Sequence, residues 1–288
     1  MTSSRVFAGI AAALILVACA HAETDIALVR HAPSLNGTIH GSLQQMTAES
    51  VSLDYGDVIT GDLIVPGTPT VRVYGRPMFG GTIPGAGSAT PSGYQVALNG
   101  GARLGHLRTR TDAITLPSVE APASPHGTRS VTLRSNRHRT GDFSTLRDLT
   151  LGSEVGRVRV PAGTYGNFTA HRGSGFTLGV AGASVPSVYA FQRLTLNDCS
   201  DLNIIGPVIV TVAQAVRIES SVGNPAHPEW LTLQISSGGL TLDNSVSFFG
   251  SVIAPNGLVK IESGSRLIGR LAADRQHGDT RQGAELRP

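Results

Sequence analysis

The sequence repeats itself within residues 240–274, near the C-terminus. Residues 240–255 read LTLDNSVSFFGSVIAP, and residues 259–274 read VKIESGSRLIGRLAAD, with the same order of apolar residues and a glycine. A unit this short buries too little apolar surface to fold alone, so it must belong to a stack of similar units. The repeat therefore constrains the fold more strongly than any other feature of the chain.

The alignment of the two copies predicts how neighbouring units pair. It places Leu242 on Ile261, Phe248 on Leu267, Val252 on Leu271, Asp243 on Glu262, Gly250 on Gly269 and Ala254 on Ala273. Residues two apart point to the same side of a strand, so the apolar positions enter one interior. Stacked copies should pair in parallel, because hairpins would need tight two-residue turns that are scarce here.

The same template recurs along the chain as apolar-x-apolar, five residues, then apolar-x-Gly-x-apolar. Further clear copies begin at Val51, Val71 and Val131, and looser ones at Val96, Leu194 and Val216. The glycines of the clear copies allow a positive φ or a close approach of the next unit; they are Gly61, Gly81, Gly141, Gly250 and Gly269. We predict an all-β fold, a parallel and right-handed β-solenoid with irregular loop insertions.

Composition agrees with an all-β protein that has many turns. Gly (35) and Pro (16) are abundant, and charged residues make up only 15% of the chain. The chain is too apolar to be disordered. We expect one solenoid domain over residues 48–275, with a leader at 23–47, a proline-rich insertion near 117–129 and a polar tail at 276–288.

The N-terminus has the pattern of an export signal. Arg5 precedes an apolar run, and Ala20-His21-Ala22 offers a cleavage site, which predicts a signal peptide over residues 1–22. Residues 16–19 (LVAC) also resemble a bacterial lipoprotein signal, which would leave Cys19 lipidated. Both interpretations place the mature chain outside the cytoplasm, secreted or at the cell surface or outer membrane. Cys199 then has no disulfide partner, and we expect it to be a small buried side chain.

Residues 240–274 resemble the bacterial polymer-forming, bactofilin-like β-solenoids. The matching positions are Leu240, Leu242, Gly250, Val252, Ala254, Val259, Ile261, Gly269, Leu271 and Ala273. Residues 250–256 (GSVIAPN) also resemble the final unit of solenoid modules in secreted and pilus-associated surface proteins. The resemblance implies a right-handed parallel β-solenoid with a structural or adhesive role and no catalytic residues. The export signal departs from the cytoplasmic location of the cytoskeletal members of that family.

The sequence offers few candidates for a reactive site. The nine histidines do not form a zinc motif, and no nucleophile elbow, phosphate loop or dinucleotide fingerprint is present. We expect no catalytic, cofactor-binding or metal-binding residues and no cofactor. The small net charge of +3 does not indicate nucleic-acid binding. One basic cluster, Arg134, Arg137, His138 and Arg139, is either a binding patch for an anionic ligand or a solvated turn.

Two classes of function remain open. The first is an exported structural or adhesive protein that binds another copy of itself, end to end or laterally, or a cell-wall or matrix polysaccharide. Any contact with a membrane would then go through lipidated Cys19. The alternative is a polysaccharide-binding or polysaccharide-cleaving β-helix protein. An enzyme would need converging carboxylates, and the candidates are Asp54, Asp57, Asp62, Asp198, Asp201 and Asp243. Asp54 and Asp243 share one template position with Glu262, which favours a role in turns.

Overall fold

The computed structural model describes residues 26–85, 91–243, 245–262, 264–278 and 284–287. Strands make up 55% of the structure and helix 2%. Every pairing between the named strands is parallel. The predicted all-β class and the predicted parallel pairing are therefore confirmed.

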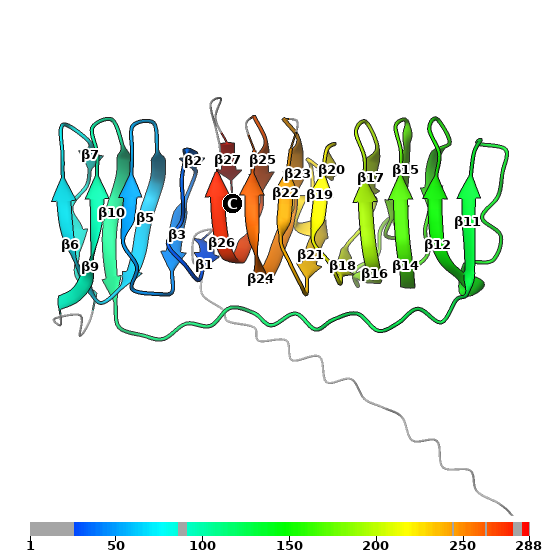
Figure 1. Cartoon of the computed structure of the whole chain (residues 1–288), viewed down its shortest axis with the longest axis horizontal. Coiled ribbons are helices and arrows are strands. Elements are labelled where there is room, and N and C mark those ends of the chain that lie inside the picture. Colours follow the sequence, from blue (N-terminus) through cyan, green and yellow to red (C-terminus); the bar gives the residue numbers. More distant parts are fainter. Residues whose placement is uncertain (1–25, 86–90, 244, 263, 279–283, 288) are drawn as a thin grey trace, which may run out of the picture.

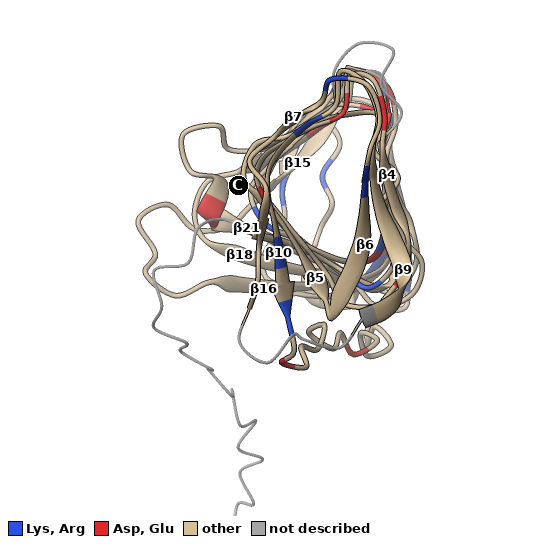
Figure 2. Ribbon diagram, turned by 90° about the vertical axis from the view of Figure 1, so that its left-hand side faces the viewer, with Lys and Arg blue, Asp and Glu red and all other residues tan. Residues whose placement is uncertain are grey.

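Strand pairing divides the stack into three faces around one interior, and Figure 2 shows the successive coils nearly superposed. Face A contains β11 (Arg129–Leu133), β12 (Leu146–Leu151), β19 (Val216–Ile218), β22 (Leu240–Leu242), β4 (Val51–Leu53), β9 (Pro91–Leu98) and β6 (Thr68–Val73). Face B contains β18 (Val208–Val212), β21 (Leu231–Ile235), β1 (Ile26–Val29), β3 (Ser42–Gln45) and β8 (Thr82–Ile83).

Face C contains β13 (Gly156–Arg159), β15 (Ser174–Leu178), β17 (Asp201–Ile204), β20 (Val222–Gly223), β23 (Ser247–Phe249), β25 (Arg266–Ile268), β27 (Ala284–Arg287), β2 (Gly37–Ile39) and β7 (Met78–Phe79). Long strands turn the corners between faces. They are β14 (Gly163–Ala170), β16 (Ser187–Leu196), β24 (Ser251–Ile261) and β26 (Leu271–Gly278), from B to A, and β5 (Val58–Pro66) and β10 (Arg103–Arg110), from C to B. Two short 3-10 helices, η1 (Phe143–Thr145) and η2 (Pro228–Trp230), complete the list.

The register within the C-terminal repeat is the one that the sequence predicts. Its pairs include Leu242 with Ile261, Phe248 with Leu267, and Val252 with Leu271. These side chains are buried in one continuous core.

The template glycines lie where neighbouring coils come close or where the backbone turns. A Cβ on Gly269 would lie 2.0 Å from the carbonyl oxygen of Gly250, so only glycine fits there. Gly61 and Gly250 also approach a carbonyl oxygen of the adjacent coil, while Gly81 and Gly141 have φ values of +98° and +73°.

The order of coils along the stack differs from their order in the sequence (Figure 1). The coils from β11 to β26 follow one another, and β1 then stacks on β26 through Leu28–Ala272 and Val29–Ala273. The copies at Val51 and Val71 follow each other in the sequence, but in the structure Val96 lies between them and pairs with both.

Residues 111–128 form a connector that we call the strap. It runs along the whole stack and joins β10, near one end, to β11 at the other (Figure 1). The proline-rich insertion expected near 117–129 is thus mostly this strap, and Arg129 already begins β11. Prolines suit an extended chain because they fix φ and lack an amide donor.

The predicted limits of the stack are too narrow. Residues 26–47, expected to be a leader, form β1, β2 and β3 and bury Ala27, Val29 and Leu43. The expected polar tail contributes the end of β26, up to Gly278, and β27. Strands of three or four residues are too short for their alternation to stand out in a sequence. The predicted signal peptide and Cys19 lie outside the described residues.

The step between β26/β27 and β1/β2 joins the two ends of the chain, and we call it the seam. On face A, the buried column Val216–Leu240–Val259 ends at Gln276, and the column Ile218–Leu242–Ile261 ends at Gly278. Gln276 is 5% exposed, and its Oε1 accepts no hydrogen bond from the described residues. A void of about 10 Å³ lies beside it. On this face, the seam therefore places a polar side chain and a glycine where the preceding steps place Val, Leu and Ile.

Replacing Gln276 with leucine should raise the free energy of unfolding by about 1–2 kcal/mol. The change removes a buried acceptor without a partner and extends the apolar column across the seam. Chemical denaturation measures the difference. Gln234→Leu is the matched control, because Gln234 lies on the outside of β21 and should change stability by less than about 0.5 kcal/mol. A Gln276→Leu protein no more stable than the wild type would contradict this description of the seam.

Candidate functional site

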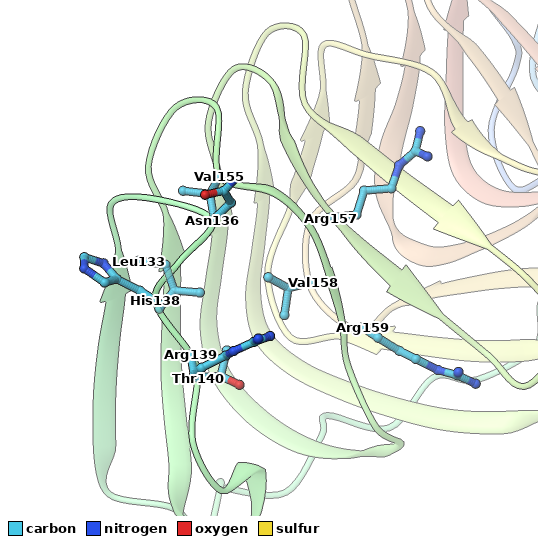
Figure 3. Close-up of a pocket in the computed structure, with 9 residues that line it drawn as sticks. All are labelled: Leu133, Asn136, His138, Arg139, Thr140, Val155, Arg157, Val158 and Arg159. Carbon is cyan, nitrogen blue, oxygen red and sulfur yellow. The ribbon is translucent and has the colours of Figure 1, made fainter.

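A hollow of about 190 Å³ lies at the β11 end of the stack. Its walls come from the segment that follows β11 and from β13, and we call it the basic groove (Figure 3). The lining residues are Leu133, Asn136, His138, Arg139, Thr140, Val155, Arg157, Val158 and Arg159.

Hydrogen bonds hold the C-terminal end of the segment after β11 in place. Arg129 donates from its guanidinium to the carbonyl oxygens of Thr140, at 2.6 Å, and Asp142, at 2.7 Å. The Asp142 carboxylate accepts from the backbone N–H of Ser144 at 2.9 Å, which begins η1. Hydrogen bonds from Ser144 hold the pKa of Asp142 below its usual range. The groove wall is therefore a fixed loop.

The opposite wall is the free edge of β13. Gly156 and Val160 donate their N–H groups to β15, at 3.2 Å to Gly173 and 3.0 Å to Thr177. Because backbone groups alternate sides along a strand, the N–H groups of Arg157 and Arg159 face away from β15. The part of the chain that the structure describes pairs no strand with this edge. The edge thus offers backbone donors beside two arginines.

Charge in the groove is positive and only partly neutralised. Arg157 reaches over Gly175 and pairs with Asp201, and this hydrogen bond raises the pKa of Arg157. No described acidic side chain pairs with Arg139 or Arg159. Figure 3 shows Arg139 extending across the floor toward Val158, while Arg157 and Arg159 point away from it. Arg139 is therefore the side chain best placed to meet a ligand in the groove.

The predicted basic cluster contributes half of its members to this groove. His138 and Arg139 line it, although His138 points outward (Figure 3), and the exposed Arg134 and Arg137 do not.

The sequence reasoning missed Arg157 and Arg159. They alternate with Val158 in β13, and residues two apart share a face. The two-residue spacing of these arginines is the sequence signal that could have identified them as a second pair of basic side chains on one face.

The carboxylates considered for an enzyme do not meet in one groove. Asp62 pairs with Arg108 of the adjacent β10 at 2.9 Å, and Asp243 pairs with Arg217 of the adjacent coil. Asp57 lies inside the stack, 1% exposed, and accepts from the N–H of Asp54 at 2.7 Å. Its burial raises the pKa of Asp57 to about 6. Of the remaining candidates, Asp54 accepts from the side-chain amide of Asn99, Asp201 pairs with Arg157, as described above, and Asp198 lies beside Cys199 on a turn.

Cys199 is exposed, which corrects the expectation that it is buried. It occupies a tight turn with a φ of +54°, closed by a hydrogen bond from Ser200 N–H to the oxygen of Asn197. The nearby Asp198 carboxylate raises the pKa of the Cys199 thiol, which opposes formation of a reactive thiolate.

The opposite end of the stack is apolar. Val71 and Val73 of the outermost coil continue the columns of the buried Val96 and Leu98, and no described coil covers them. Met78, in the same coil, is 61% exposed. The two ends of the stack therefore differ in chemistry, one basic and one apolar.

Fold and groove together define an all-β protein with large parallel sheets and a basic end. Searches against family models, curated proteins and solved structures gave no match for the chain. Among the described residues, no helix has the length and apolar character needed to cross a membrane.

Proposed function

We propose that this chain is an exported bacterial structural or adhesive protein of the cell surface or extracellular matrix, folded as a right-handed parallel β-solenoid and acting without catalysis. The main support for this proposal is that its carboxylates form ion pairs within the stack. Asp62, Asp201 and Asp243 each pair with an arginine of another coil, so their charges serve the stack. The predicted export signal and the resemblance of residues 240–274 to polymer-forming solenoids favour the same proposal.

The basic groove favours an anionic polysaccharide as the ligand of this protein. Uronic acid polymers carry regularly spaced carboxylates, and guanidinium groups bind carboxylates through charge-assisted hydrogen bonds. Arg139 and Arg159 lack an acidic partner among the described residues, so they are available to such a polymer. The exposed apolar end, around Val73 and Met78, favours association with another copy.

Binding to polygalacturonate, with neutral dextran as the comparison, tests this function. We expect the wild-type chain to bind polygalacturonate, and Arg139→Gln/Arg159→Gln to bind it about tenfold more weakly, because charged hydrogen bonds are lost. Arg76→Gln is the control, since Arg76 is exposed in the outermost coil at the apolar end. Unchanged binding by the double variant would exclude the groove, and release of cleaved sugars would favour the enzyme alternative.

A further inference from the structure

The seam joins two parts of the stack that the chain reaches by different routes. Residues 129–278 and 284–287 build one block of coils, and residues 26–110 build the other among the described residues; we call them the C-terminal and N-terminal blocks. Only the strap connects them covalently, and it leaves and enters at the far ends of the stack (Figure 1). The contact between the blocks is therefore made entirely by non-covalent stacking.

The contacts at the seam do not require that both blocks belong to the same chain. Leu28 and Val29 pair with Ala272 and Ala273 in the parallel register used between all coils. Arg30 donates to the carbonyl oxygen of Pro255 at 3.2 Å and lies 3.3 Å from the carboxylate of Asp274. The N-terminal block of a second copy presents the same groups to the same surface.

The seam is thin on face A. Among the described residues, the blocks pair there only through the isolated bridge between Ser34 and His277, whereas the preceding step pairs residues 258–261 with 275–278. The buried apolar columns also stop at this point, at Gln276 and Gly278. Separation at the seam therefore breaks fewer backbone pairs on face A than separation at the preceding coil step.

The strap is held nearly fully extended when the blocks of one chain stack on each other. It crosses about ten coil steps, or roughly 50 Å at 4.8 Å per step, and its residues 111–128 can reach at most about 60 Å. A fully flexible chain of this length would average about 23 Å between its ends, and the prolines of the strap shift that average toward the extended length. The strap is mostly exposed, and Gln192 holds it through the carbonyl oxygens of Pro122 and Ala123.

We propose that the seam is an exchange surface, on which the N-terminal block of a second copy stacks in the same register. Two copies exchange their N-terminal blocks and form a two-fold dimer of side-by-side, antiparallel stacks. In that arrangement the ends joined by each strap lie next to each other, so the strap spans the distance between two stacks and shortens. Closed two-fold exchange satisfies both seams and leaves no block unpaired.

Cysteine cross-linking between full-length copies tests the exchange. Leu28→Cys and Ala272→Cys are made in separate chains that also carry Cys19→Ser and Cys199→Ser, unfolded together, refolded at high concentration and oxidised. Leu28 and Ala272 are partly exposed and directly paired, within the Cα spacing that a disulfide needs. We expect a covalent dimer from the mixture, and an internal link in the double variant under dilute refolding.

Two controls make the result decisive. Thr232→Cys mixed with Ser251→Cys probes a step inside the C-terminal block, and should give at least tenfold less covalent dimer than the seam pair. Ten Gly/Ser residues inserted after Ala123 relax the strap in the closed monomer, and should lower the seam yield at least threefold. The proposal is overturned if the seam mixture gives no more dimer than the control pair, or if the longer strap leaves its yield unchanged.

Discussion

Replacing Phe168 with alanine should lower the free energy of unfolding by about 3–5 kcal/mol, the cost of removing a large buried aromatic side chain. Phe168 is fully buried in β14, and its ring centroid lies 4.8 Å from Tyr165, 5.4 Å from Phe176 and 5.0 Å from Phe191. These rings come from three strands and from all three faces of the stack. Alanine at position 168 would therefore leave a cavity between these rings, and the hydrogen-bonded coils are too rigid to close it.

Denaturant unfolding followed by circular dichroism measures this loss. Val185→Ala is the matched control, because Val185 is 73% exposed and its truncation should change stability by less than about 0.5 kcal/mol. Phe168→Leu should fall between the two, since it keeps most of the apolar volume. A loss below about 1 kcal/mol for Phe168→Ala would show that the rings do not form the core of this part of the stack.

Asp57→Asn should make the protein more stable above neutral pH and leave it nearly unchanged in acid. Burial raises the pKa of Asp57 from 3.8 to about 6, so the fold disfavours the charged carboxylate. Wild-type stability should fall as the pH rises from about 4 to about 6, by up to about 3 kcal/mol at 1.36 kcal/mol per pKa unit. Asparagine keeps an oxygen that can accept from Asp54 N–H but carries no charge.

Denaturation of both proteins at about pH 4, 6 and 8 tests this sign and window. The difference between the variant and the wild type should be small at pH 4 and largest at pH 8. Asp112→Asn, in the exposed start of the strap, should show no such difference. A variant that loses stability equally at all three pH values would mean that Asp57 acts through its hydrogen bonds, and that its buried charge has little cost.

The candidate site was predicted only in part, for reasons that particular residues make clear. His138 and Arg139 are adjacent in a conspicuous basic run, so composition alone reveals them. Arg157 and Arg159 join them because β13 is the first face C strand at this end of the stack, with its other edge open. The neighbours of the carboxylates also depend on how the coils stack. Asp201 is close to Arg157 because Gly175 between them has no side chain, a relation that three separate coils create.

The sequence by itself determined the unit of this protein and how one unit pairs with the next. Spacing alone places Phe248 on Leu267 and Val252 on Leu271, because side chains two apart share a side of a strand. Only the tertiary structure decided the order of the coils. All units share one apolar template, so each could stack on any other, and local pattern cannot show that Val96 separates Val51 from Val71. The contact of Leu28 with Ala272 at the seam is hidden in the sequence for the same reason: the shared template does not show which units become neighbours, and the path of the whole chain decides it.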